Sequence, residues 1–247
     1  MTVYETDNGS CPYLENRRWV THTFAVPSLP ADIYEEMINS GWRRSGTFFY
    51  QNHCPGCDEC RPIRVPVEQF TPSKSQRRVL RRNQDVEVEV HANAYSEEIF
   101  QLYKRYQEER HGKDETSGVS GFRRFLCDSA VTTVQMHYRK NGTLLGVGWV
   151  DELSDGLSSV YFVFDPEESR RSLGTFSIMK EIERARALGM RWHHLGFYVR
   201  DSRKMSYKAN FQPYELLING SWVRQPSNHP YAAHQPPKSE LNSERNS

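Results

Sequence analysis

Residues 132–198, TTVQMHYRKNGTLLGVGWVDELSDGLSSVYFVFDPEESRRSLGTFSIMKEIERARALGMRWHHLGFY, decide the fold. The turn sequences Lys-Asn-Gly and Ser-Asp-Gly separate three apolar runs in this stretch, and the third run ends at Asp165-Pro166. Short apolar runs bounded by such turns are typical of antiparallel strands joined by hairpins. The stretch is therefore expected to begin with a meander of three strands.

A helix and a further strand follow the meander. Ile178 and Ile182 lie on one face of a helix predicted over 174–188, and Gly189 is typical of a residue just past a helix end. The next predicted strand covers 192–198. This order indicates an α+β fold whose mixed, largely antiparallel sheet is flanked by helices, as in the acetyltransferase-like (GNAT-like) acyltransferase fold.

Shorter elements are predicted before this stretch. The expected strands are 19–26, 46–51 and 86–90, and the expected helices are 31–40, 74–83, one capped by Ser96, and a short one near 121–127. We expect three parts: a Cys-containing N-terminal section over 1–70, a main unit over 71–224 on which it packs, and a disordered polar tail over 225–247.

The composition limits the class of protein. Hydrophobic residues make up 37% and charged residues 26% of the 247 residues, which is typical of a soluble globular chain. No apolar run approaches the roughly 18 to 20 residues that a membrane helix needs, and the polar N-terminus is no secretory signal. Five cysteines, an odd number, argue against a disulfide framework and favour a reduced, cytoplasmic protein.

One basic segment stands out against a net charge of +1. Residues 74–82, KSQRRVLRR, hold five basic residues and no acidic one. On a helix, residues four apart share a face, so the arginines form two pairs. The segment predicts a contact with the phosphate backbone of a nucleic acid, and its alternative is a solvated basic face. The candidate phosphate contacts are Arg77, Arg78, Arg81 and Arg82.

The cysteines are spaced like metal ligands. Cys54, Cys57 and Cys60 form a C-x2-C-x2-C pattern, and Cys11 is a candidate fourth ligand. This spacing suits zinc or an iron–sulfur cluster. The alternative is a packed, reduced loop of structural cysteines, and both interpretations stay open.

Several long motifs occur in the order found in one protein family. They are CPYL at 11–14, GWRRSGTFFYQNHCPGCDECRPIRV at 41–65, FTPSKSQRR at 70–78, SSVYFVFDP at 158–166, SLGTFSIMKEIERARALGM at 172–190 and LGFYVRDSRKMSYKANFQPYELL at 195–217. In these motifs the chain resembles the arginyl-tRNA–protein transferase family. Its short length and CPGCDEC pattern resemble the bacterial leucyl branch of that family.

This resemblance implies an activity. The unit over 71–224 would be a GNAT-like transferase that uses aminoacyl-tRNA instead of acetyl-CoA. It would move leucine from leucyl-tRNA to an acceptor protein that begins with Asp or Glu, and so mark that protein for N-end-rule degradation. The implied partners are leucyl-tRNA and such acceptors, with no membrane and no required cofactor.

The chemistry implied is the attack of an amine on an ester, which needs no covalent enzyme intermediate. The reference pKa of an α-amine is about 7.7 to 8.0, so part of it is already neutral at pH 7. Holding the two reactants together supplies roughly 7 to 11 kcal/mol in well-aligned cases. Donors aimed at the developing oxyanion contribute further stabilisation.

The family's K-M-x-Y-K motif carries the candidate catalytic residues. Lys204 or Lys208 is expected to meet the acidic side chain of the acceptor or the tRNA terminus, and Tyr207 to relay a proton. The residue types alone favour a solvated basic loop, and the family motif reverses that preference in favour of the site.

Six further residues are candidate substrate contacts: Arg43, Arg44, Ser45, Tyr161, Ser172 and Gly174. The first three follow a Gly-Trp turn, and outside the context of the family they would be interpreted as surface residues. Ser172 and Gly174 open a helix whose free N–H groups would face the terminal adenosine of tRNA or simply cap the helix. Tyr161 fits the core as well as the site.

Three alternatives remain at this level. The first alternative is that arginyl-tRNA is the donor, because the leucine and arginine branches share most motifs. A second alternative is an acetyl-CoA-dependent N-acetyltransferase, which the fold pattern alone would favour. The third is a metal-stabilised RNA-binding module without catalysis.

Overall fold

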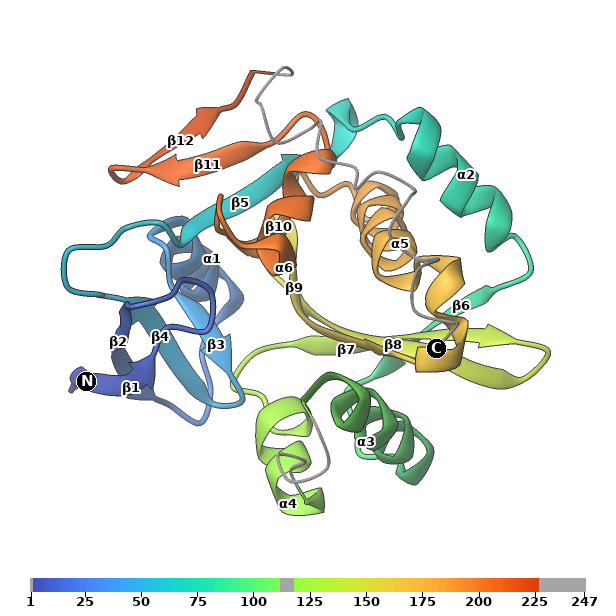
Figure 1. The fold of residues 1–247 in the computed structure, drawn as a ribbon, viewed down its shortest axis with the longest axis horizontal. Helices are drawn as coiled ribbons and strands as arrows, with labels where there is room; N and C mark the ends of the chain where they lie inside the picture. The colour runs from blue at the N-terminus through green and yellow to red at the C-terminus, as the bar shows by residue number, and fades with distance from the viewer. Residues whose placement is uncertain (1, 112–117, 227–247) are drawn as a thin grey trace, which may run out of the picture.

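Two sheets form the scaffold of the protein in a computed structural model that describes residues 2–111 and 118–226 (Figure 1). Apart from Gln225 and Pro226, the expected disordered tail lies outside the described residues. The smaller sheet has the strand order β1-β2-β4-β3, and the larger has the order β12-β11-β5-β10-β9-β8-β7-β6. The strands are β1 (Tyr4–Ser10), β2 (Arg18–Ala25), β3 (Arg43–Ser45), β4 (Phe48–Asn52), β5 (Arg61–Pro66), β6 (Glu87–Ala92), β7 (Thr133–Lys140), β8 (Thr143–Glu152), β9 (Gly156–Phe164), β10 (Trp192–Tyr198), β11 (Glu215–Ile218) and β12 (Ser221–Arg224).

Helices cover both faces of the larger sheet. In Figure 1, α3 and α4 lie on one side of β7 and β8, and α5 lies on the other side with α2 beyond it. The helices are α1 (Ala31–Asn39), α2 (Lys74–Arg82), α3 (Glu97–His111), α4 (Val119–Phe122), α5 (Leu173–Ala187) and α6 (Arg203–Ser206). Among the residues that the structure describes, no helix is both long and apolar enough to cross a bilayer.

The α+β, GNAT-like fold expected from residues 132–198 is confirmed. β7, β8 and β9 form an antiparallel meander, α5 follows, and β10 returns parallel to β9. Ile178 and Ile182 of α5 are buried against the sheet, as the helical spacing requires. Gly189 has φ of +71°, a conformation in which glycine ends a helix at low cost.

Both faces of β8 are buried, and its glycines make this possible. Trp149 packs against Phe122 on the α3 side, while Gly146 and Gly148 lie under the ring of Phe162 on the α5 side. A Cβ at Gly146 would lie 3.0 Å from that ring. The small residues therefore let the aromatic ring pack onto the strand.

The sequence did not reveal β5, because it contains two prolines. Pro62 and Pro66 pair with β10, but β11 meets β5 only at Ile63 and Arg64. Each proline thus has a strand on one side only, the edge-like position at which a sheet tolerates proline. Consequently β5, from the N-terminal section, lies inside the larger sheet; the boundary expected at residue 70 stays a prediction.

A buried ion pair fastens the smaller sheet to the larger one. Arg44 of β3 and Asp151 of β8 have side chains that are 1% and 0% exposed. The carboxylate accepts two hydrogen bonds from Arg44, one from Tyr34 at 3.0 Å and one from Thr133 at 2.7 Å. Its oxygens are therefore well satisfied, as a buried charge requires.

β9 and β10 separate after a short parallel pairing. They pair only from Gly156 to Ser158 and from Trp192 to His194. The register then shifts by one residue on each strand, at Val160 against β8 and at Leu195 against β5. Such bulges bend a strand and re-aim its side chains. The two strands diverge beyond this point, and the space between them is the candidate site.

Candidate active site

Two adjoining cavities occupy the divergence between β9 and β10. The larger, of about 680 Å³, lies between β9, the N-terminal half of α5, and the segment from α6 to Lys208. The smaller, of about 130 Å³, extends toward β3 and β4. They share lining residues from the bulged strands, namely Ser159, Val160 and Leu195, and from the following segment, Met205 and Lys208, together with Tyr13.

Two buried cations donate hydrogen bonds to backbone carbonyl groups of the two diverging strands. Arg43 donates from Nη2 to the Ser159 carbonyl of β9 at 2.7 Å, and Lys208 donates from Nζ to the Phe197 carbonyl of β10 at 2.8 Å. A Cβ at Gly196 would lie 3.6 Å from each of these nitrogens. The two cationic groups therefore lie close to the same point of β10.

Burial alters the acidity of the groups around this pair. Desolvation, with a contribution from Arg43, lowers the pKa of Lys208 to about 7. Burial also raises the pKa of Tyr13 to about 12 and raises that of Tyr50. Both phenols line the smaller cavity as neutral groups, and they keep their protons for hydrogen bonding.

The smaller cavity can accommodate a carboxylate. Three basic side chains and three tyrosines line a volume of about 130 Å³, which suits a short acidic side chain and little more. Arg43 has further N–H groups beyond the one bound to Ser159, because a guanidinium carries five. The arrangement favours anions by charge and by hydrogen bonding.

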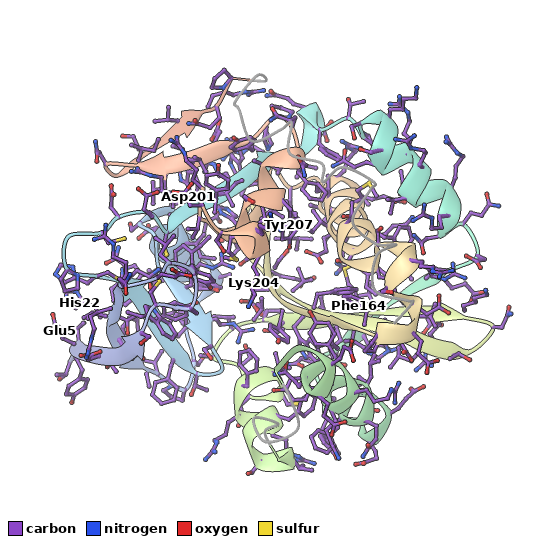
Figure 2. The ribbon with its side chains drawn as sticks, in the orientation of Figure 1. Glu5, His22, Phe164, Asp201, Lys204 and Tyr207 are labelled. Atoms are coloured by element: carbon purple, nitrogen blue, oxygen red, sulfur yellow. The ribbon has the colours of Figure 1, made fainter. Side chains whose placement is uncertain are left out.

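Lys204 and Tyr207 lie at the rim of the larger cavity. Figure 2 shows both on the segment that follows β10, on the side toward α5, with Phe164 at the end of β9. Lys204 is exposed and Tyr207 is 40% exposed, whereas Lys208 is buried beneath them. The two lysines of the motif therefore have different environments, one solvated and one desolvated.

Ser172, Gly174 and Tyr161 also line the larger cavity. Ser172 adopts a left-handed conformation, with φ of +57°, and α5 begins directly after it. A side chain at Gly174 would meet nothing within 4 Å, so the first turn of α5 is open to the cavity. Tyr161 donates to Gln107 at 3.3 Å and packs its ring against Phe125.

Arg44 and Ser45 have other surroundings. Arg44 borders the smaller cavity, but its guanidinium hydrogen-bonds Asp151, Thr133 and the Gly46 carbonyl. Ser45 pairs with Phe48 in the smaller sheet and is not among the residues that line either cavity. Of the three consecutive candidates, Arg43 is the one that faces the divergence.

A buried group that the sequence analysis did not single out lies in the wall of the larger cavity. Glu181 of α5 is 2% exposed and His193 of β10 is fully buried. Their Oε2 and Nε2 atoms are 3.1 Å apart, and the Ser159 hydroxyl donates to the same carboxylate oxygen. One sequence signal could have revealed it: Glu181 sits between Ile178 and Ile182 on the apolar face of α5.

The basic helix is confirmed as α2. Its capping box joins Ser73 and Gln76, and all four candidate phosphate contacts, Arg77, Arg78, Arg81 and Arg82, are exposed. A cavity of about 330 Å³ lies between the start of α2, the start of α5 and Tyr207. A hollow surface thus runs from the larger cavity to the basic helix.

The four N-terminal cysteines lie around a separate cavity of about 460 Å³. Cys11, Cys54, Cys57 and Cys60 are free thiols, and burial, followed by the other three cysteines, raises the pKa of Cys60 to about 12. Within the described residues, no three of these sulfurs all lie within 4.8 Å of one another. The donor types fit zinc or an iron–sulfur cluster, but the sulfurs are more widely spread than ligands of one ion, so metal binding stays a prediction.

Structures of other proteins resemble this one only distantly. FemX matches with a TM-score of 0.45 and 9% identity, covering 82% of this chain and 81% of FemX. L-PGS from Bacillus licheniformis matches with a TM-score of 0.42 and 11% identity, covering 57% and 47%. At these TM-scores neither likeness carries an argument about this chain.

Sequence comparisons are far more specific. The family model described as arginine-tRNA-protein transferase, N terminus, matches residues 9–78, and that of the C terminus matches residues 98–218. An aspartate/glutamate leucyltransferase of Pseudomonas fluorescens is 40% identical over 227 residues, which cover 90% of this chain and 96% of that protein. One of Marinobacter nauticus is 38% identical over 226 residues, covering 90% and 95%. The chain therefore belongs to the arginine-tRNA-protein transferase family.

Proposed function

We propose that this protein transfers leucine from leucyl-tRNA to the N-terminal Asp or Glu of acceptor proteins, and so marks them for N-end-rule degradation in the cytoplasm. The names of its relatives in Pseudomonas and Marinobacter support the donor and the acceptor. The observation that carries the proposal is the pair of buried cations, Arg43 and Lys208, in a small cavity beside a large one.

In this proposal the two cavities divide the two substrates. The acidic side chain of the acceptor enters the smaller cavity, where Arg43 and Lys208 bind its carboxylate. A side chain without charge would leave both cations uncompensated, which disfavours other N-terminal residues. The acceptor's α-amine then lies near Ser159, where the two cavities meet.

The larger cavity holds the esterified end of tRNA. Its volume of about 680 Å³ is within the usual range for small-ligand sites, and its apolar lining suits a leucyl side chain beside the adenosine. The first turn of α5, at Leu173 and Gly174 directly after Ser172, offers N–H groups to the terminal nucleotide. Lys204 at the rim meets the tRNA backbone, and Arg77, Arg78, Arg81 and Arg82 contact phosphates farther along.

The reaction is aminolysis of the aminoacyl ester. The amine nitrogen forms a bond to the leucyl carbonyl carbon, the bond from that carbon to the ribose oxygen breaks, and the ribose oxygen leaves with a proton. Tyr207, at the rim near the start of α5, is the proposed donor of that proton. The transfer itself requires no cofactor, because placement of the two ends supplies most of the acceleration.

The test offers the purified protein peptides that begin with Asp, Glu or Asn, together with labelled leucyl-tRNA, arginyl-tRNA or acetyl-CoA. We expect label from leucyl-tRNA on the Asp and Glu peptides and little on the Asn peptide. Label from arginyl-tRNA alone would make the donor arginine, and label from acetyl-CoA would identify an acetyltransferase. Salt-sensitive tRNA binding with no product from any donor would favour an RNA-binding module.

The role of the cysteines is a separate proposal. Cys11, Cys54, Cys57 and Cys60 would close around zinc or an iron–sulfur cluster as a structural group for the N-terminal section. Zinc and iron are measured after anaerobic purification. Stoichiometric metal that is lost in a Cys57→Ser variant supports the proposal, and absence of both metals favours a reduced loop.

A further inference from the structure

The buried group formed by Ser159, Glu181 and His193 joins three elements at the wall of the larger cavity. Ser159 comes from β9, Glu181 from α5 and His193 from β10. The Glu181 Oε2 atom accepts from the Ser159 hydroxyl and lies 3.1 Å from His193 Nε2, and the same nitrogen lies 3.3 Å from the Ser159 hydroxyl. Two polar side chains, one from β9 and one from β10, therefore meet at one carboxylate oxygen of α5.

The position of this group relates it to both substrates. Glu181 lines the larger cavity. Ser159 lines both cavities, and its backbone carbonyl accepts a hydrogen bond from Arg43. Ser159 thus connects the cation proposed to bind the acidic side chain with the buried carboxylate. An N-terminal residue whose side chain is held by Arg43 has its α-amine only a few bonds away, on the side of Ser159.

A buried carboxylate in this place needs an explanation. Removing a carboxylate from water costs several kcal/mol unless it is paired and hydrogen-bonded, and the apolar face of α5 would pack as well with a leucine. The groups that face Glu181 are His193 from β10, Ser159 from β9 and the neutral phenol of Tyr138 from β7. The pKa of Tyr138 is raised by burial and by Glu181, so this phenol adds no charge.

We propose that Glu181, held by Ser159 and His193, is the catalytic base that takes a proton from the attacking α-amine. This inference rests on the proposed function. As the nitrogen forms its bond to the leucyl carbonyl carbon, one N–H proton passes to the Glu181 carboxylate. The carbon–oxygen bond to ribose then breaks, and the ribose oxygen takes a proton from Tyr207. Glu181 returns its proton to Tyr207 through solvent in the cavity, so that both residues regain their starting protonation states.

His193 acts as a positioning residue in this scheme. Its Nε2 holds the carboxylate, and its Nδ1 has no hydrogen-bond partner among the described residues. It reaches the substrate only through Glu181. A His193→Gln change should therefore lower kcat less than a change at Glu181, with the same direction in the pH profile.

The test compares Glu181→Gln with Glu183→Gln, an exposed residue two positions away that pairs with Lys180. General base catalysis contributes roughly 10²- to 10⁴-fold. We expect Glu181→Gln to lower kcat by at least about 100-fold, with KM values for tRNA and peptide within about threefold. The loss should shrink as pH rises, because hydroxide then takes the N–H proton in place of the missing carboxylate. Glu183→Gln should match the wild type.

A second variant guards against misfolding. Ser159→Ala removes one hydrogen bond to Glu181 and leaves the backbone carbonyl for Arg43, and we expect a loss of about tenfold in kcat with unchanged tRNA binding. Wild-type activity in Glu181→Gln or in Ser159→Ala, or a loss matched by an equal loss of folded protein in the melting curve, would overturn the inference. A wild-type protein that transfers no leucine would overturn the proposed function as well, so the two failures are distinguishable.

Discussion

The larger sheet has a closed region and an open region, and the contrast between them accounts for where chemistry is expected. From β7 to β9 the strands stay paired along their length, apart from one register shift in each pairing, and the buried charge of this region, Asp151, is bound by Arg44 and other protein groups. Between β9 and β10 the ladder stops after Ser158, and beyond it Arg43 and Lys208 donate to one carbonyl of each strand. The closed region uses its polar groups for the fold, whereas the open region keeps polar groups beside a cavity.

Arg43 and Arg44 are adjacent in the sequence, yet one serves the open region and the other the closed region. Successive side chains of a strand point to opposite faces. On β3 this sends Arg44 to Asp151 in the closed region and Arg43 to Ser159 in the open one. Two adjacent and chemically identical side chains therefore have different roles, which mutation can separate.

The largest effect is expected in the closed region. Arg44→Ala leaves the Asp151 carboxylate buried without its cation, and breaking such a pair costs about 3–5 kcal/mol. The free energy of unfolding, measured by urea titration, should fall by that amount. Arg43→Ala is the matched comparison and should cost clearly less, since it removes a hydrogen bond to a carbonyl and no buried carboxylate loses its partner. Equal losses in the free energy of unfolding for the two variants would contradict the different roles of Arg43 and Arg44.

In the open region stability and activity should change in opposite directions. Lys208→Met removes a cation proposed to bind the acceptor, and kcat/KM for an Asp peptide should fall about 100-fold, or about 2.7 kcal/mol at 1.36 kcal/mol per tenfold.

Because burial lowers the pKa of Lys208 from 10.5 to about 7, the unfolded chain binds its proton more readily over that range. The native state is thereby penalised below pH 10.5, and most fully below pH 7. Lys208→Met should thus be at least as stable as the wild type; a lower melting temperature with unchanged kcat/KM would contradict the assignment.

The same pKa predicts how selectivity depends on pH. The ratio of kcat/KM for Asp to Asn peptides cancels the titration of the acceptor amine, which both peptides share. With a Lys208 pKa of about 7, this ratio should decline above pH 7, approaching a tenfold change per pH unit. Lys208→Arg keeps the charge at all these pH values, so its ratio should be flat. A wild-type ratio that stays constant from pH 6 to 9 would contradict a titrating lysine in the acceptor site.

The smallest effect is expected far from the divergence, on α2. Arg78→Gln together with Arg81→Gln should weaken tRNA binding several-fold and reduce the slope of log affinity against log salt concentration by about 2. Filter binding at several salt concentrations measures both. The charge-matched control changes Arg17 and Arg18, exposed arginines at the start of β2, and should leave the slope unchanged. Equal slopes in both double variants would exclude α2 from the contact.

Local patterns predicted the closed region well, and the open region only in part. The strands of 132–198 and helices α2, α3 and α5 follow from periodicity and turn residues, which act over a few positions. The divergence depends on two one-residue bulges, at Val160 and Leu195, and neither has a signal in the residue types. The bounds expected for α2 agree with the structure to one residue, and its capping box at Ser73 and Gln76 marks its start locally.

The candidate site was predictable where residue types are unusual, and not where burial decides. Lys204 and Lys208 look alike in a basic motif, but only the packing makes one of them a desolvated group. Ser159, Glu181 and His193 are ordinary residues on three separate elements, and tertiary structure alone assembles them. An acidic residue within an apolar helix face was the one clue.

The position of β5 has a consequence for the way the chain can be divided. Residues from both matched family segments alternate within a single ladder, since β5 separates β10 from β11. Neither half can complete its hydrogen bonding by itself, so each would expose a ribbon of unsatisfied backbone if produced separately. Split after Phe70, the chain should behave as complementing fragments that are insoluble apart and regain structure when expressed together. A chimaera that exchanges one half between relatives must therefore preserve the pairing of β5 with β10 and β11 before the residues that line any cavity.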